Sequence, residues 1–303
     1  FNIVFGILIA FFSNYFFKGF SGENDWRWMI GIVALPALIY SVIVIRIPES
    51  PRWLILTKKD DQAGLAVLEM IYAPAQAKES FNEIKKDVIT STKVDTFFSK
   101  KYKFPILLAF LLAFFNQLSG INFILYYAPE ILEMAGLGAK ESLFNSILIG
   151  VTNLVFTLIG MRLIDVLGRK QLMLIGSLGY ILSLTMVAFA FYSQLGSVVL
   201  LLSIMLSIAS HAIGQGAVIW VFISEIFPNH LRASGQAFGS STHWVLAAVI
   251  PSLIPTLFST IGAGTVFLIF TIAMVFQLLF VIFMMPETKG VSLEKLSKTL
   301  TKE

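Results

Sequence analysis

The sequence predicts an all-α membrane protein. Of its 303 residues, 57% are hydrophobic and 13% are charged, whereas soluble domains typically have about 45–50% apolar and about 25% charged residues. Several stretches longer than about 18 residues carry almost no charge, which is typical of membrane-spanning helices. A soluble core does not need apolar runs of that length, so we expect the chain to cross a lipid bilayer several times.

Composition also narrows the class of protein. The net charge is +4, but the basic residues gather in particular loops and form no patch with interleaved aromatic residues, so we expect no nucleic-acid partner. Cysteine is absent and only three histidines occur, at positions 211, 230 and 243, so we expect neither a metal site nor a cofactor. We also expect no enzymatic activity, because the sequence has no nucleophile–base set and no phosphate loop.

The apolar stretches predict eight spans of about 20 residues each. They cover approximately residues 1–17, 27–47, 104–134, 142–164, 171–192, 197–224, 234–258 and 264–285. A polar stretch follows the second span and predicts short amphipathic helices. Asp60 and Asp61 are expected to cap the first of these, and Ser80 with Glu83 forms a capping-box pattern that predicts the start of another.

Lysine and arginine predict the orientation. The loops on one side contain only Lys18, Arg27 and Lys140, and the other side contains nearly all the remaining basic residues. The positive-inside rule therefore predicts a multi-pass protein of the plasma (inner) membrane, with the 50–100 linker and the C-terminus in the cytoplasm.

An internal similarity predicts the domain organisation. The second span ends in PESPR (48–52) and the last span ends in PETKG (286–290), which indicates a duplicated architecture with parallel repeats. We expect six helices in each half and four helices missing upstream. The predicted domains are 1–49 (the last two helices of the N-terminal bundle), 50–100 (cytoplasmic linker helices), 101–285 (a complete C-terminal six-helix bundle) and 286–303 (a cytoplasmic tail).

Five motifs identify a family resemblance. They are PESPRWL (48–54), NQLSGINFILYY (116–127), DVLGRK (165–170), WVFISEIFPNHLR (220–232) and PETKG (286–290). In this order and spacing the chain resembles the sugar porter family of the major facilitator superfamily. The resemblance implies the major facilitator fold, with about eight of its twelve helices present, and a seventh family helix (104–134) that is unwound in the middle and bends as a gate. It further implies a monomer that carries a monosaccharide by alternating access.

The polar residues of NQLSGINFILYY are the first candidate site. Asparagine and glutamine suit sugar hydroxyls because each side chain both donates and accepts without carrying a charge. The resemblance implies that the substrate-binding residues are Gln117, Asn122, Asn153, Trp220 and Trp244, together with Asn116 and His243. At the position of Asn116 the family usually has Gln, and at the position of His243 it has Asn or Gln. The alternative is that the amides only bond neighbouring helices and that Trp244 only packs or anchors.

Two further roles follow from the resemblance. Tyr126 and Tyr127 are candidates for a gate, with interface packing as the alternative. A cytoplasmic salt-bridge lock between the two bundles is predicted from Glu49, Arg52, Asp165, Arg169, Lys170, Glu225, Arg232 and Glu287. The alternative is that these charges only orient the protein in the membrane.

The sequence leaves three classes of function open. The predicted function is transport of a hexose or pentose, by uniport or proton symport, so protons remain an open second partner. A major facilitator carrier of a different small solute is weaker, because no Asp or Glu lies in the middle of a span. A sugar receptor that does not transport is the third possibility, although it would be expected to carry a larger cytoplasmic segment.

Overall fold

The computed structural model describes residues 1–90, 96–228, 230–291, 296 and 299–301, and its described residues form helices joined by short connections. The chain divides into two units. The first contains residues 1–25 and 97–303, and the second contains residues 26–96.

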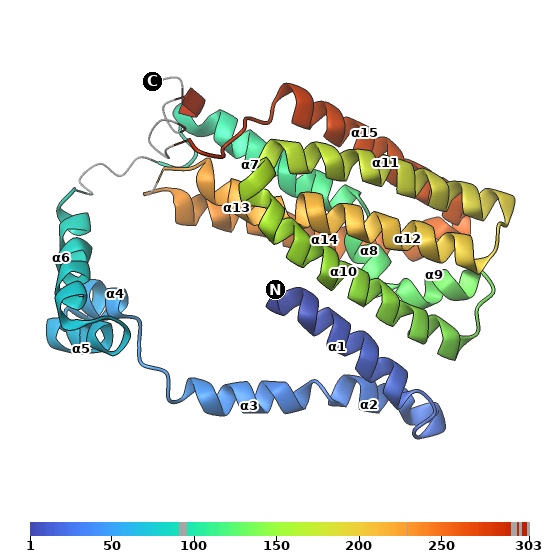
Figure 1. Ribbon diagram of the computed structural model, residues 1–303, viewed down its shortest axis with the longest axis horizontal. Coiled ribbons are helices and arrows are strands. Elements are labelled where there is room, and N and C mark those ends of the chain that lie inside the picture. The colour runs from blue at the N-terminus through green and yellow to red at the C-terminus, as the bar shows by residue number, and fades with distance from the viewer. Residues whose placement is uncertain (91–95, 229, 292–295, 297–298, 302–303) are drawn as a thin grey trace. The chain divides into compact units, whose positions relative to one another are not determined.

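The first unit is a bundle of helices (Figure 1). They are α1 (Asn2–Phe17), α7 (Lys103–Leu118), α8 (Ile121–Tyr126), α9 (Ala128–Met134), α10 (Ala139–Leu167), α11 (Arg169–Ser193), α12 (Ser197–His211), α13 (Ala217–Glu225), α14 (Arg232–Ile261) and α15 (Ala263–Phe283). Short 3-10 helices cover Gly22–Asn24 (η1) and Lys100–Tyr102 (η3), and a π-helix, η4, covers Ala212–Gly216.

Seven helical stretches of the described residues are long and apolar enough to cross a membrane. They are Gly22–Val44, Lys100–Tyr126, Ala139–Leu167, Arg169–Ser193, Ser197–Glu225, Arg232–Ile261 and Ala263–Phe283. Each overlaps one of the predicted spans. The remaining predicted span corresponds to α1, which has 16 residues and is therefore about 24 Å long, shorter than a hydrocarbon core of about 30 Å.

Small residues let the helices of the first unit approach closely. α11 packs against α12, α15 and η4, and a Cβ atom on Gly176 of α11 would lie only 2.7 Å from the Cα of Gly214. On the other side of the bundle α1 packs against α10, where a Cβ on Gly150 would lie 3.0 Å from the Phe11 ring. Such small-residue contacts are typical of packed membrane helices, which associate by van der Waals contact.

The predicted span 197–224 is not one regular helix, because η4 interrupts it. Gly214 and Gly216 lie inside η4, and glycine lowers helix propensity by about 1 kcal/mol relative to alanine. A π-helical turn bulges the chain and often marks a functional position. Here Gly214 of η4 packs against Gly176 of α11, and α13, which follows η4, contacts α7.

The second unit carries most of the candidate span Gly22–Val44 and the linker. Its helices are α2 (Asp25–Gly31), α3 (Ala34–Val44), α4 (Pro51–Trp53), the π-helix η2 (Leu54–Lys58), α5 (Asp61–Ile71) and α6 (Pro74–Thr90). Asp60 Oδ1 accepts a hydrogen bond of 3.0 Å from the backbone N–H of Ala63, which confirms the predicted cap. The capping box at Ser80 was wrong, because α6 already begins at Pro74, a residue whose fixed φ favours the first helical turn.

The predicted domain boundaries remain a prediction. The structure groups α1 with α10 in the first unit and assigns α3 to the second, whereas the sequence grouped residues 1–49 as one part. The sequence could not reveal this packing, because it depends on Phe11 meeting Gly150 more than a hundred residues away.

Candidate functional site

The helix predicted at 104–134 breaks at Ser119 and Gly120. Gly120 has φ +75°, a left-handed conformation that favours glycine, and α8 starts directly after it. The Ser119 hydroxyl donates to the Asn116 carbonyl at 2.6 Å and accepts from the Ile121 N–H at 3.3 Å. Ser119 therefore replaces part of the hydrogen bonding that the broken helix loses, as membrane depth requires. A second break, at Tyr127, separates α8 from α9.

We expect Gly120→Ala to destabilise the protein by more than the same change at Gly136. Both glycines have positive φ, so alanine costs about 1–2 kcal/mol of backbone strain at either position. Only at Gly120 would the new Cβ also meet the ring of Phe270, at 2.6 Å from Cδ2, whereas Gly136 has open space. Thermal unfolding in detergent measures the difference. Equal losses for the two variants, or no recovery when Phe270→Leu is added to Gly120→Ala, would show that the contact with Phe270 is unimportant.

The amides at this break form one connected network. Gln117 Nε2 donates to Asn116 Oδ1 at 3.1 Å and lies 3.0 Å from Nδ1 of His243, while Gln117 Oε1 accepts from Asn122 Nδ2 at 3.0 Å. Gln117 is 1% exposed. The network thus joins α7, α8 and α14, and Gln117 is its centre.

Two tryptophans lie beside this network. The rings of Trp220 and Trp244 each have their centroid 5.1 Å from that of His243, in edge-to-face arrangements. The Trp220 carbonyl accepts from Gln236 Nε2 at 2.8 Å, which ties α13 to α14. Trp244 is 58% exposed. The structure therefore brings together Gln117, Asn116, Asn122, His243, Trp220 and Trp244.

The other predicted residues lie apart from these contacts. Asn153 is buried in α10, and Tyr127 stacks on Phe123 with ring centroids 5.1 Å apart. Tyr126 is 57% exposed at the end of α8. The gating role of the two tyrosines and the binding role of Asn153 stay predictions.

A second layer of buried polar contacts supports the break, and sequence reasoning missed it. Tyr180 of α11 is fully buried, and its hydroxyl donates to Ser119 Oγ at 3.2 Å; its ring also meets that of His211. The available signal was the presence of tyrosine and histidine inside apolar runs. Which of them would meet Ser119 depends on how α11 and α12 pack, and periodicity does not determine that packing.

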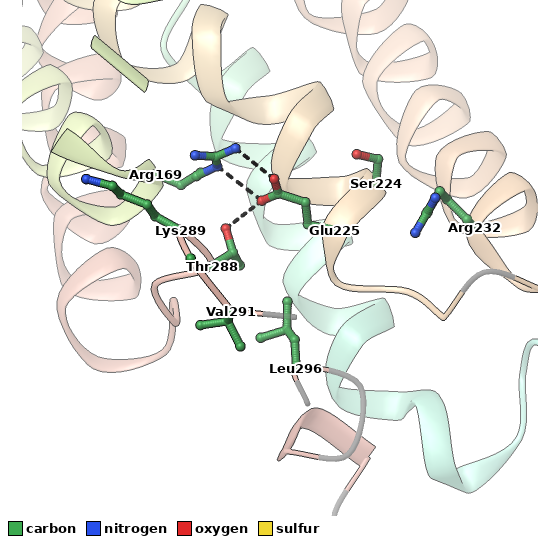
Figure 2. A pocket seen from close by; sticks show the side chains of 9 residues that line it. Arg169, Ser224, Glu225, Arg232, Thr288, Lys289, Val291 and Leu296 are labelled. Atoms are coloured by element: carbon green, nitrogen blue, oxygen red, sulfur yellow. Dashed lines mark hydrogen bonds and ion pairs between the residues drawn. The ribbon is translucent and has the colours of Figure 1, made fainter. Parts of the chain in front are cut away.

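A charged cluster, defined here as Arg169, Glu225, Glu287 and Thr288, lies where α11 begins and α13 ends. Figure 2 shows Arg169, Glu225 and Thr288 of this cluster. Arg169 binds Glu225 through two contacts, Nη2 to Oε1 at 2.8 Å and Nε to Oε2 at 3.2 Å. Thr288 donates its hydroxyl to Glu225 Oε2 at 2.6 Å. Paired contacts of this kind are stronger and more specific in geometry than a single contact.

Glu287 caps α11 from a distant part of the chain. Its carboxylate accepts from the backbone N–H groups of Arg169 and Lys170, each at 3.0 Å, and of Thr288 and Lys289, each at 2.9 Å. A helix N-terminus favours a negative charge. Gly168 has φ +95°, and a Cβ there would lie 2.6 Å from Glu287 Oε2, so the glycine of DVLGRK makes room for the carboxylate of PETKG.

These contacts predict a pH dependence. Partial burial acts to raise the pKa of Glu287, but the N–H groups of Lys289, Arg169, Lys170 and Thr288 outweigh it, so the pKa lies below its ordinary value of 4.5. A lowered folded-state pKa stabilises the fold above the unfolded value and loses that contribution as pH falls through the folded value. We expect the melting temperature of the wild type to exceed that of Glu287→Gln at neutral pH, with the gap closing below pH 4.5. A gap independent of pH would contradict this account.

The remaining lock candidates are placed as follows. Asp165 lies 3.4 Å from Arg169 but is 79% exposed, and Lys170 Nζ donates to the Ile282 carbonyl at 3.0 Å. Arg232 has two buried guanidinium nitrogens, Nε and Nη2, with no hydrogen-bond partner among the described residues. Glu49 pairs with Lys58 within the second unit. Arg52 belongs to the same unit. The Arg169–Glu225 pair joins helices of the first unit, and a lock between two bundles stays a prediction.

Comparisons with known proteins agree with these observations. Residues 1–300 match the family model described as "Sugar (and other) transporter". The chain is 34% identical to the arabinose-proton symporter of Bacillus subtilis, over 91% of the chain and 60% of that protein. It is 33% identical to the D-xylose-proton symporter of Escherichia coli K12, over 98% of the chain and 62% of that protein.

Solved structures give the same result. The inward-open xylose transporter XylE of E. coli superposes with a TM-score of 0.82 at 32% identity, covering 98% of this chain and 63% of that one. XylE bound to 6-bromo-6-deoxy-D-glucose gives a TM-score of 0.80 at 32% identity, covering 98% and 65%. The chain thus spans less than two thirds of the length of these relatives.

Proposed function

Because the chain belongs to the sugar porter family of the major facilitator superfamily, we propose that the complete gene product carries a monosaccharide across a membrane by alternating access. The observation that carries the proposal is the network centred on Gln117, in which four polar side chains meet at a helix break beside two tryptophans. Two relatives are named as symporters of arabinose and D-xylose, and one solved relative binds 6-bromo-6-deoxy-D-glucose. These names support a pentose or hexose as the cargo.

The chemistry of the network suits a sugar. Each amide both donates and accepts, as does each sugar hydroxyl, and net hydrogen-bond energies of about 1 kcal/mol allow recognition without trapping the cargo. A sugar that enters would take over contacts that Gln117, Asn122 and His243 now make with one another. The exposed Trp244 ring offers a flat apolar surface for the CH face of the sugar.

The helix break suits a moving part. Because the regular helix is already interrupted at Ser119 and Gly120, α8 can change direction relative to α7 while few backbone hydrogen bonds break. The charged cluster and the other predicted lock residues would pair with one another when the cytoplasmic side is shut. A sugar can drive this change if it binds one of the two states more tightly than the other by only a few kcal/mol. The predicted orientation, with the linker and the C-terminus in the cytoplasm, belongs to this proposal.

Proton coupling is the finer part of the proposal. The named relatives include proton symporters of arabinose, xylose and galactose, which supports symport over uniport. The carrier of a different small solute is the second candidate. It is favoured by His243, one of the two network residues that depart from the family pattern, which can accept or donate depending on its tautomer.

A fluorescence titration tests the cargo. We expect D-xylose, L-arabinose, D-galactose or D-glucose to change the tryptophan emission of the purified gene product in a saturable way, and the change to disappear in Trp220→Phe or Trp244→Phe. The chain has five tryptophans, so Trp53→Phe in the second unit serves as the matched control and should keep the response. A folded protein that responds to none of these sugars would favour the different-solute carrier.

A further inference from the structure

A tyrosine on another helix holds the helix break in place. Tyr180 of α11 is fully buried, and its hydroxyl donates to Ser119 Oγ at 3.2 Å. The two residues are 61 positions apart in the sequence, so this hydrogen bond joins α11 to the point where α7 ends. Tyr180 is not one of the residues proposed to touch the sugar, so the bond has a role that the sugar contacts do not explain.

The bond from Tyr180 completes the hydrogen bonding of Ser119. A serine hydroxyl can donate once and accept twice. Ser119 Oγ donates to the Asn116 carbonyl at 2.6 Å and accepts from the Ile121 N–H at 3.3 Å, and the Tyr180 hydroxyl takes the remaining acceptor position. Because every hydrogen-bonding capacity of this hydroxyl is used, Ser119 is fixed relative to the end of α7, the start of α8 and the middle of α11.

α11 is packed tightly enough to serve as a fixed support. It packs against α12, α15 and η4, and a Cβ on Gly179, the residue before Tyr180, would lie 2.9 Å from the Cβ of Ser210 in α12. The Tyr180 ring also meets the His211 ring edge to face, with centroids 6.1 Å apart. His211 ends α12, and η4 follows it directly. Tyr180 therefore contacts both of the interrupted spans.

Both interrupted spans carry residues of the proposed sugar site. Gln117 lies near the end of α7, Asn122 lies in α8, and Trp220 lies in α13, which follows η4. We propose that Tyr180 is a positioning residue of this site, which acts through Ser119 and does not touch the sugar. The inference rests on the proposed function. Its physical basis is that a ligand binds more tightly to a protein whose binding-competent arrangement is already populated.

Removal of the tyrosine hydroxyl alone tests this role in the purified gene product. Tyr180→Phe keeps the ring and loses the bond to Ser119, so the helix break samples more arrangements. In the tryptophan titration, the sugar that binds the wild type among D-xylose, L-arabinose, D-galactose and D-glucose should bind about fivefold more weakly, equivalent to about 1 kcal/mol. In the sugar-free protein, hydrogen–deuterium exchange should be faster in peptides that cover residues 118–126, because exchange reports local opening without any ligand.

Two further variants separate positioning from stability. Ser177 lies one turn before Tyr180 on α11, and its hydroxyl accepts from Gln277 Nε2 at 2.7 Å. Ser177→Ala therefore loses a buried bond between helices, and it should lower the melting temperature while it keeps the sugar affinity and the exchange of residues 118–126. In a Ser119→Ala background, Tyr180→Phe should cost no further affinity, because the acceptor of its hydroxyl is already gone.

The outcomes distinguish this inference from the proposed function. Wild-type protein that binds none of the four sugars contradicts the proposed function. Unchanged exchange at the break in Tyr180→Phe overturns the positioning role whether or not a sugar binds, and so does wild-type sugar affinity in that variant or a further affinity loss in the Ser119→Ala background. If Tyr180→Phe does not fold, Ser119→Ala alone supplies the test, because it removes the acceptor. It should then weaken sugar binding at least fivefold and speed exchange at the break, and a failure of either would overturn the inference.

Discussion

Replacing Gln117 by alanine is expected to weaken the apparent affinity for the sugar about 30-fold, equivalent to about 2 kcal/mol. The change removes the amide that bonds Asn116, Asn122 and His243 together, so both the cargo contacts and the arrangement of the remaining side chains are lost. The measurement is the concentration of sugar that gives half-maximal binding or exchange.

Gln277 provides the matched control for this prediction. It is as deeply buried as Gln117, and its Nε2 donates to Ser177 Oγ at 2.7 Å, which joins α15 to α11. Gln277→Ala should therefore lower the melting temperature and leave the apparent sugar affinity unchanged. If the two alanine variants behave alike in both measurements, the amides at the helix break serve only to hold helices together.

Replacing Glu225 by glutamine is expected to lower the free energy of unfolding by about 3 kcal/mol, near the lower end of the cost of breaking a buried ion pair. The side chains of Arg169 and Glu225 are only 11% and 21% exposed. In the variant, water therefore solvates the unpaired Arg169 guanidinium poorly. Unfolding of the purified protein in mixed micelles measures the change.

Asp165 is the control on the same arginine. Its contact with Arg169 is longer, at 3.4 Å, and its side chain is 79% exposed, so Asp165→Asn should cost no more than about 1 kcal/mol. In a double-mutant cycle, Arg169→Gln should cost less in the Glu225→Gln background than in the wild type. Additive losses would mean that the pair does not stabilise the structure.

Residues close together in the sequence allowed accurate predictions. The resemblance carried by NQLSGINFILYY predicted a helix that is unwound in the middle, and the structure breaks it at Ser119–Gly120. Apolar length predicted the spans, because hydrocarbon thickness fixes how many residues a helix needs. The prediction that a helix starts at Ser80 was wrong, although Ser80 and Glu83 match the capping-box pattern, because the helix already starts at Pro74.

Partners far apart in the sequence were less accessible. The resemblance supplied the residues of the network, but their contacts depend on packing, since Gln117 and His243 are 126 positions apart. The ion pair of Arg169 with Glu225, the cap by Glu287 and the hydrogen bond from Tyr180 to Ser119 likewise arise only when the helices assemble. The charges of these residues could be read from the sequence, whereas the partner of each could not.

Counterflow of labelled sugars in liposomes tests the central claim most directly. The complete gene product is reconstituted with unlabelled sugar inside and labelled xylose, arabinose, galactose or glucose outside, without a proton gradient, so that cargo is tested separately from coupling. The account predicts exchange of at least one sugar, strongly reduced by Gln117→Ala and retained in Gln277→Ala. Folded protein that exchanges none of the four, or a Gln117→Ala variant that exchanges as the wild type does, would contradict it.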